Sequence, residues 1–194
     1  MNTEVLHLGP GNLEPAAGRT AEVLAGGGVC VIPTDTLYGL VALDRDREAV
    51  RRVYRIKQRP PDKPLIRLIG SLGSLGRYTD QQLPPRLRRY WPGPLTVVFR
   101  ACDGGSIALR WPRSGFLQAL FKLTGCEPLV APSANLSGGE DIFDCESLVS
   151  TFTGQVELIL CAEAGPAGRE PSTIVDITGD RWRVLRAGAV KLDL

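Results

Sequence analysis

Apolar and polar positions alternate along the chain with spacings that separate strands from helices. Short apolar runs bounded by Gly, Pro or polar residues predict buried strands at 28–32, 65–69, 95–101, 107–112, 128–131, 156–161, 172–177 and 183–186. Apolar positions at helical spacing predict helices at 13–25, 116–123 and 146–152, one ending near residue 58, and a short one within 70–79. Either Asp44 or Asp46 can cap the helix that ends near residue 58.

The two kinds of element are mixed, without strict alternation or an internal repeat. At 194 residues the chain can bury one substantial core, and nothing in it requires a second domain. We therefore expect residues 1–194 to form one α/β (α+β) domain on a twisted mixed sheet with flanking helices.

Cations and small hydroxyl groups recur where predicted strands end. The polar loop 33–39 follows the first buried run, and a cationic turn with Lys57, Arg59 and Lys63 follows the next helix. Arg110 and Arg186 end two later strands. The hydroxyl groups belong to Thr34, Thr36, Ser133, Ser137, Ser172 and Thr173.

Such turns suit phosphate oxygens, because Arg offers a planar fork of donors and Lys a compact charge. Small hydroxyl groups and exposed amides suit carboxylate, hydroxyl or phosphate groups. Together, these cations and hydroxyl groups favour phosphoryl or nucleotidyl transfer. In such reactions the protein mainly positions the substrates and neutralises their charge. Solvated cations and ordinary turn residues are the alternative explanation. Neither common nucleotide-binding glycine loop occurs.

Composition narrows the function classes. The formal charge of +2 is too small to imply a polyanion partner by itself. His7, the single histidine, lies near the N-terminus, which argues against Ser-His-Asp, Cys-His and His-rich zinc catalysis. Five well-separated cysteines predict reduced thiols and neither a metal cage nor a disulfide frame. With no signal-peptide pattern and no apolar run of membrane-spanning length, we expect a cytoplasmic protein.

A second basic cluster lies between residues 81 and 91. Arg86, Arg88 and Arg89 precede Tyr90 and Trp91. Interleaved basic and aromatic residues can bind nucleic acid, while an amphipathic surface helix explains the same pattern.

Six short motifs, read in order, carry a resemblance to a known family. They are Pro33–Gly39, Lys57–Pro60 with Lys63–Leu65, Trp91–Thr96, Ala131–Gly138, Ser172–Asp176 and Leu185–Gly188. In this order the chain resembles the YrdC-type threonylcarbamoyl-AMP synthases, over about residues 14–190. The resemblance is to the short, single-domain form.

The resemblance implies a fold and an activity. The fold is a twisted mixed sheet, mostly parallel, with helices around a concave basic cavity. The activity forms threonylcarbamoyl-adenylate and pyrophosphate from L-threonine, bicarbonate and ATP, with Mg²⁺ accompanying ATP. The product supplies a threonylcarbamoyl transferase complex that makes t6A at position 37 of tRNAs reading codons that begin with A.

The resemblance also implies site residues. Lys57, Arg59 and Lys63 are the candidate catalytic cations. The ATP-binding set is Arg59, Lys63, Arg110, Ser133, Asn135, Asp141 and Arg186, and the threonine-binding set is Thr36, Ser114, Ala131 and Ser172; no residue is assigned as a metal ligand. Three positions depart from the family pattern: Ser114 and Leu68 stand where relatives carry histidine, and Asp141 where many carry serine.

Two other functions stay open on the sequence alone. One is an RNA-binding module of the same fold, with tRNA or double-stranded RNA as partner and the 86–91 cluster as an extended patch. The other is carbamoyl transfer on the same scaffold.

Overall fold

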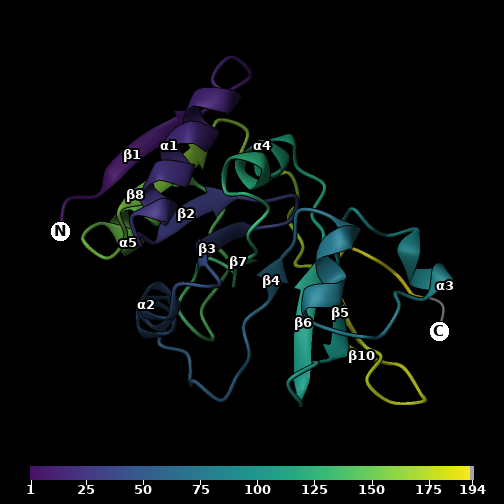
Figure 1. Ribbon diagram of the computed structural model, residues 1–194. Coiled ribbons are helices and arrows are strands. Elements are labelled where there is room, and N and C mark those ends of the chain that lie inside the picture. Colours follow the sequence, from purple (N-terminus) through teal and green to yellow (C-terminus); the bar gives the residue numbers. More distant parts are fainter. Residues whose placement is uncertain (193–194) are drawn as a thin grey trace.

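One twisted sheet of ten strands organises the protein. The computed structural model describes residues 1–192, and its strand order is β1-β8-β2-β3-β7-β4-β6-β5-β9-β10 (Figure 1). The strands are β1 (Glu4–Leu8), β2 (Cys30–Pro33), β3 (Tyr38–Leu43), β4 (Arg67–Leu68), β5 (Leu95–Arg100), β6 (Ser106–Arg110), β7 (Leu129–Val130), β8 (Leu158–Ala162), β9 (Thr173–Asp176) and β10 (Arg183–Arg186).

The sheet is mixed, as the sequence predicts. Four neighbouring pairs are parallel, namely β1–β8, β2–β8, β4–β6 and β5–β9, and the other five are antiparallel. The mostly parallel sheet that the resemblance implied is therefore wrong. Several chain-adjacent strands, such as β2 and β3, are joined by short turns that can connect only antiparallel neighbours.

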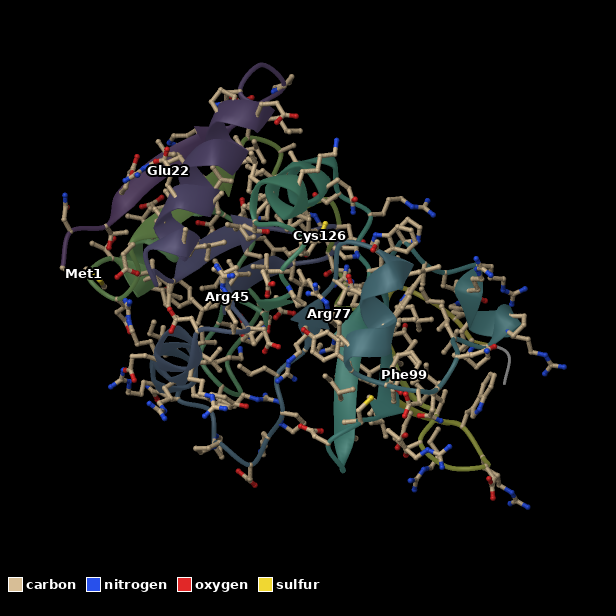
Figure 2. All side chains as sticks on the ribbon, viewed as in Figure 1. Met1, Glu22, Arg45, Arg77, Phe99 and Cys126 are labelled. Atoms are coloured by element: carbon tan, nitrogen blue, oxygen red, sulfur yellow. A yellow bond between two sulfur atoms is a disulfide. The ribbon has the colours of Figure 1, made fainter. Side chains whose placement is uncertain are left out.

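Helices cover both faces of the sheet. The helices are α1 (Leu13–Ala25), α2 (Arg47–Lys57), α3 (Pro85–Arg88), α4 (Gly115–Leu123) and α5 (Cys145–Phe152), and a 3₁₀ helix spans Leu72–Arg77. One core cluster joins α1 and α4 to the sheet, and a second joins α2 and α5 to it. A third lies beneath α3 and the 3₁₀ helix, where it includes Phe99 of β5 (Figure 2).

Most predicted elements are confirmed. In α2, for example, local capping interactions fix both ends of the helix. The Asp46 carboxylate accepts hydrogen bonds from the Glu48 and Ala49 amides at 3.1 and 3.0 Å, so Asp46, not Asp44, is the N-cap. Gln58 ends the helix in the left-handed conformation, with φ of 52°.

Three strands differ from the prediction. β3 was not among the predicted strands, and it begins inside the expected polar loop 33–39. The apolar run 65–69 pairs regularly only at Arg67–Leu68. β1 lies within a segment for which the sequence predicted no strand, because it is a half-exposed edge strand that lacks a continuous apolar run.

The prediction for the cysteines is also partly wrong. Cys145, at the start of α5, forms a disulfide with Cys161 of β8, whereas Cys30, Cys102 and Cys126 are free. The two partners lie 16 residues apart and meet only because α5 packs beside β8, so their spacing alone does not reveal the pairing.

No helix within residues 1–192 is both long enough and apolar enough to cross a membrane.

Candidate functional site

A small pocket of about 40 Å³ opens at the centre of the sheet, where loops from distant parts of the chain converge. Its walls come from the loop between β2 and β3, from both sides of β4, from the end of β6, from the loop after β7, and from the segments beside β9 and β10. The lining residues are Thr34, Thr36, Leu37, Tyr38, Gly39, Ile66, Leu68, Arg110, Ala131, Ser133, Pro171, Ser172 and Arg186.

The loop between β2 and β3 is closed by its own side chains. The Thr34 hydroxyl donates to the Leu37 carbonyl at 2.6 Å and accepts from the Thr36 amide at 3.1 Å. These local bonds fix the backbone of a turn whose groups no strand partner satisfies. The Thr36 hydroxyl is therefore held at the pocket wall, where the residue is 3% exposed.

Arg110 reaches this loop from the end of β6. One guanidinium nitrogen donates to the Thr36 hydroxyl at 2.7 Å, and another donates to the Asp35 carboxylate at 2.5 Å. The remaining Asp35 oxygen accepts from the Arg113 amide at 2.9 Å. Burial lowers the pKa of Arg110 and the Asp35 charge opposes that change, so the cation is kept in place by its buried partner.

Asp35 is the site residue that the sequence interpretation missed. It lies inside the recognised 33–39 motif, between two threonines, and its side chain is 7% exposed. A buried guanidinium needs a paired carboxylate, so the prediction of Arg110 as a site residue could have directed a search for one.

Ser172 and Arg186 form the opposite wall. The Ser172 hydroxyl lies 2.8 Å from the Thr96 hydroxyl, and Arg186 donates to the Ser172 carbonyl at 2.8 Å and to its hydroxyl at 3.1 Å. Burial and the charges of Arg110 and Arg59 lower the pKa of Arg186, whereas Asp141 raises it. The two guanidinium groups thus concentrate positive charge on one pocket.

Lys57 does not line the pocket; it lies behind it and holds the 133–135 loop. Its ammonium donates to the Ser133 carbonyl at 2.7 Å, the Asn135 carbonyl at 3.0 Å and the Asn135 side-chain oxygen at 2.6 Å. These three bonds use the donors that an ammonium has. Burial, with a smaller effect from Arg59, lowers the pKa of Lys57 to about 8, so it stays mostly protonated at neutral pH. The structure thus shows the Lys57 ammonium bonded to this loop, and its role as a catalytic cation stays a prediction.

Comparisons with known proteins identify the family of the chain. A family model for Sua5, YciO and YrdC proteins, described as "Telomere recombination", matches residues 22–188. The chain belongs to this family.

Two curated members of the Sua5/YciO/YrdC family are similar to the chain over most of its length. It is 34% identical over 179 residues to a threonylcarbamoyl-AMP synthase of Pyrococcus abyssi and 31% identical over 191 residues to one of Bacillus subtilis. The matches cover 86% and 91% of this chain, but 52% and 54% of those proteins. The chain thus spans about half the length of the curated relatives it matches.

Solved members of the family share the fold. P. abyssi Sua5 complexed with L-threonine matches with a TM-score of 0.84 and 28% identity, over 97% of this chain and 58% of that one. Escherichia coli YciO matches with a TM-score of 0.86 and 25% identity, over 97% of both chains.

Of the residues that the family resemblance assigned, six line the pocket: Thr36, Arg110, Ala131, Ser133, Ser172 and Arg186. The Ala131 amide donates to the Ile66 carbonyl at 2.9 Å, so its carbonyl is the backbone group that can face a ligand. Leu68, at a departure from the family pattern, also lines the pocket and is buried.

Four of the assigned residues lie around the pocket without lining it. Arg59 donates to the Lys63 and Pro64 carbonyls at 3.2 and 3.0 Å in the turn after α2, where Lys63 is exposed. The Asn135 amide nitrogen donates to the Gly139 carbonyl at 2.7 Å and lies 3.4 Å from an Asp141 oxygen. Of these four residues, Arg59 and Asp141 interact electrostatically with the pocket-lining Arg186 and so mark a polar rim of the pocket.

Ser114 is not part of the lining. Its hydroxyl accepts from the Leu117 amide at 3.3 Å and caps α4. The structure therefore places the Ser114 hydroxyl at the cap of α4, and its contact with threonine stays a prediction.

The 86–91 cluster consists of the last residues of the short helix α3 (Pro85–Arg88) and the turn that follows it, with its apolar side chains packed inward. Leu87 and Trp91 are buried in the third core cluster, and the Trp91 indole donates to the Leu95 carbonyl at 2.6 Å. Arg89 stacks on the ring of the neighbouring Tyr90, with 4.8 Å between the guanidinium carbon and the ring centre. Trp91 is thus unavailable to stack on a base, which weakens the RNA interpretation of this cluster.

Proposed function

We propose that this chain catalyses formation of threonylcarbamoyl-adenylate and pyrophosphate from L-threonine, bicarbonate and ATP. It would thereby be a nucleotidyltransferase of the t6A pathway, supplying a threonylcarbamoyl transferase for position 37 of tRNAs that read codons beginning with A. The observation that carries the proposal is one pocket in which two small hydroxyl groups, of Thr36 and Ser172, are each bound by a guanidinium, of Arg110 and Arg186.

The side chains and backbone groups of the inner pocket suit the chemical groups of a small amino acid such as threonine. Thr36, Ser172 and the Ala131 carbonyl can bind its ammonium and hydroxyl groups, while Arg110 faces its carboxylate. Leu68 presents an apolar surface for the methyl group. The two synthases that resemble the chain, and the Sua5 structure with L-threonine, support this choice of substrate.

The outer rim suits the phosphates of ATP. Arg186 and Arg59 supply cations at its edge, and Lys63 is exposed in the same turn as Arg59. Nucleotide binding there would place the α-phosphorus between the rim and the inner pocket, where charged donors stabilise charge that develops on phosphate oxygens.

The reaction then needs no protein nucleophile. The threonine nitrogen bonds to the carbon of bicarbonate with loss of water, giving a carbamate. A carbamate oxygen bonds to the α-phosphorus of ATP while the bond from that phosphorus to the bridging oxygen breaks, and the electron pair leaves with pyrophosphate. Arg59, Lys63 and Arg186 offset the charge of the leaving group.

The residues present fit the Mg²⁺ that accompanies ATP. Mg²⁺ is usually held by phosphates and water with one or two carboxylates. Both Asp35 oxygens are engaged, whereas Asp141 is a half-buried carboxylate at the rim and is the candidate ligand. When bound, the ion neutralises phosphate charge.

Pyrophosphate release by the purified protein tests the proposal. With ATP and Mg²⁺ present, L-threonine and bicarbonate are added separately and together. We expect release only when both are present, with serine a weaker substrate because it lacks the methyl group that Leu68 faces. Pyrophosphate release that is independent of threonine would contradict the assignment of threonine as the substrate. Absence of release would contradict the proposed synthase activity. Salt-sensitive tRNA binding without release, surviving Arg186→Ala, would favour the RNA-binding module.

A further inference from the structure

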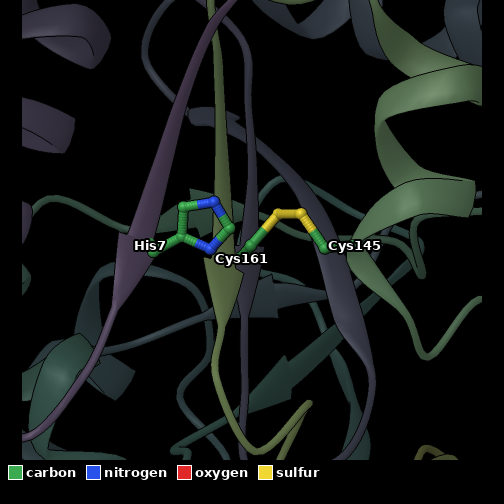
Figure 3. A group of neighbouring side chains, drawn as sticks. All are labelled: His7, Cys145 and Cys161. Carbon is green, nitrogen blue, oxygen red and sulfur yellow. A yellow bond between two sulfur atoms is a disulfide. The ribbon is translucent and has the colours of Figure 1, made fainter.

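One histidine and two cysteines from three different elements meet on the β1 side of the sheet. His7 of β1 is paired directly with Cys161 of β8, so both side chains leave the sheet on the same face. Cys145, the first residue of α5, is bonded to Cys161 (Figure 3). One imidazole nitrogen and both sulfur atoms lie within 4.8 Å of one another.

This cluster is separate from the pocket described above and is reachable from solvent. It lines a depression of about 310 Å³ whose walls share no residue with that pocket. His7 is exposed and Cys145 half-buried, whereas Cys161 is fully buried beneath them. A small reductant or an ion can therefore approach from the His7 side.

We propose that, once the disulfide is reduced, His7, Cys145 and Cys161 bind a soft divalent cation such as Zn²⁺. Two thiolates and one imidazole are a donor set that zinc accepts, with a fourth position left for water or a carboxylate. The site does not rest on the proposed synthase activity.

Reduction of the disulfide produces the two thiols from which the thiolate ligands form. A dithiol reductant gives two electrons to the sulfur–sulfur bond and becomes a disulfide itself, and its two protons pass to the sulfurs of Cys145 and Cys161. Binding of the cation then releases these protons, because thiolates are the ligands. Thiol pairs of this kind are usually kept reduced inside cells.

The three elements keep their places without the sulfur–sulfur bond. β1 pairs with β8 over the whole range Glu4–Leu8, and Asp144 caps α5 by accepting from the Ser147 amide at 2.8 Å. The Cα atoms of the two cysteines are 5.4 Å apart, so side-chain rotation can separate the sulfurs around an ion.

Glu163 is the candidate fourth ligand. It follows Cys161 by two residues and lines the same depression. Its carboxylate lies over Gly9, where a Cβ would come within 2.6 Å of a Glu163 oxygen. Asp144, the other carboxylate in the depression, is occupied as the cap of α5.

Cobalt and zinc titrations of the full chain test the proposal. The protein is reduced with a phosphine without oxygen, freed of reductant and titrated with Co²⁺, and Zn²⁺ then displaces the Co²⁺. We expect one tightly bound ion per chain, sulfur-to-cobalt charge-transfer absorption, and loss of binding after reoxidation to the disulfide. Thiol counts before and after reduction should be three and five, from the three free cysteines and the total of five.

Matched variants separate this site from adventitious binding. Cys145→Ser and Cys161→Ser should abolish the charge-transfer band, and His7→Ala should weaken binding roughly 100-fold or more. The control is Cys102→Ser/Cys126→Ser, which removes the two exposed thiols outside the cluster and should bind normally. Circular dichroism checks that each variant is folded.

Three results would overturn the proposal: a disulfide that the phosphine does not open in the folded protein, a reduced protein that takes up no ion, or binding that survives Cys145→Ser.

Discussion

At the scale of single residues, the pocket depends on cations whose positions are fixed by oxygen acceptors of the protein. Arg110 is held by Asp35 and Thr36, and Arg186 by the carbonyl and hydroxyl of Ser172. Each guanidinium is thus oriented before any ligand arrives, which lowers the cost of binding a phosphate or carboxylate.

For this reason, Arg186→Ala should lower kcat for pyrophosphate release by about 10²–10³-fold, the usual effect of losing one preorganised donor to developing charge. The unfolding free energy should fall by only about 1 kcal/mol, because the lost bonds are half-exposed. Steady-state kinetics and urea unfolding measure the two effects.

Arg183→Ala is the matched control for Arg186→Ala. Arg183 lies on the same strand, but its side chain is 76% exposed and it is 3.7 Å from its Asp176 partner. Its loss should leave kcat within about twofold, since such surface pairs contribute little. An equal loss of kcat in both variants would contradict the assignment of Arg186 to the site.

At the scale of elements, α2 connects its own amphipathic pattern to the pocket. Its apolar face packs Ala49, Val53 and Ile56 into the second core cluster, and this packing brings Lys57, the last residue of the helix, beneath the 133–135 loop. The Lys57 carbonyl in turn accepts from the Ser137 amide at 3.0 Å. The helix end and the loop therefore order each other.

Lys57→Met should break this connection while keeping the volume of the side chain. Three buried or half-buried acceptors lose their donor, so we expect a loss of about 1–3 kcal/mol in the urea unfolding free energy and a raised KM for ATP. Arg55→Met, on the exposed face of the same helix, should change stability by less than about 0.5 kcal/mol. An unaltered KM in Lys57→Met would show that the loop is ordered without this residue.

The elements differ in how well the sequence reveals them. The helices α1, α2, α4 and α5 follow from apolar periodicity and from caps such as Asp46 and Asp144, because these signals are local. β1 is stabilised by pairing with β8, more than 150 residues away in the chain, and carries little signal of its own. Short strands such as β4 are likewise limited by their neighbours.

At the scale of the whole molecule, the Cys145–Cys161 bond joins α5 to the sheet. Reduction, with a chelator present, should lower the unfolding free energy by about 3 kcal/mol. This is the entropic contribution expected for a disulfide between cysteines that are separated by 16 positions in the sequence, because reduction frees that loop in the unfolded chain. Urea midpoints with and without reductant measure the loss. Cys102→Ser should not change the urea midpoint of the oxidised protein. A midpoint that reduction does not lower would contradict the contribution of the disulfide to stability.

What the sequence by itself determined is therefore what neighbouring residues encode. This covers the mixed α/β class, most helices and strands, and the loops and strand ends that bear Thr36, Arg110, Ser133, Ser172 and Arg186. The six ordered motifs sufficed to predict the family.

Tertiary structure alone decided which of those side chains share a pocket. In the folded chain Asp35 pairs with Arg110, and Lys57 lies beneath the 133–135 loop. Ser114 caps α4, and Cys145 and Cys161 lie beside His7. The reason is physical, since these contacts join segments far apart in the chain. Their geometry depends on sheet order and on the packing of helices, which no local pattern specifies.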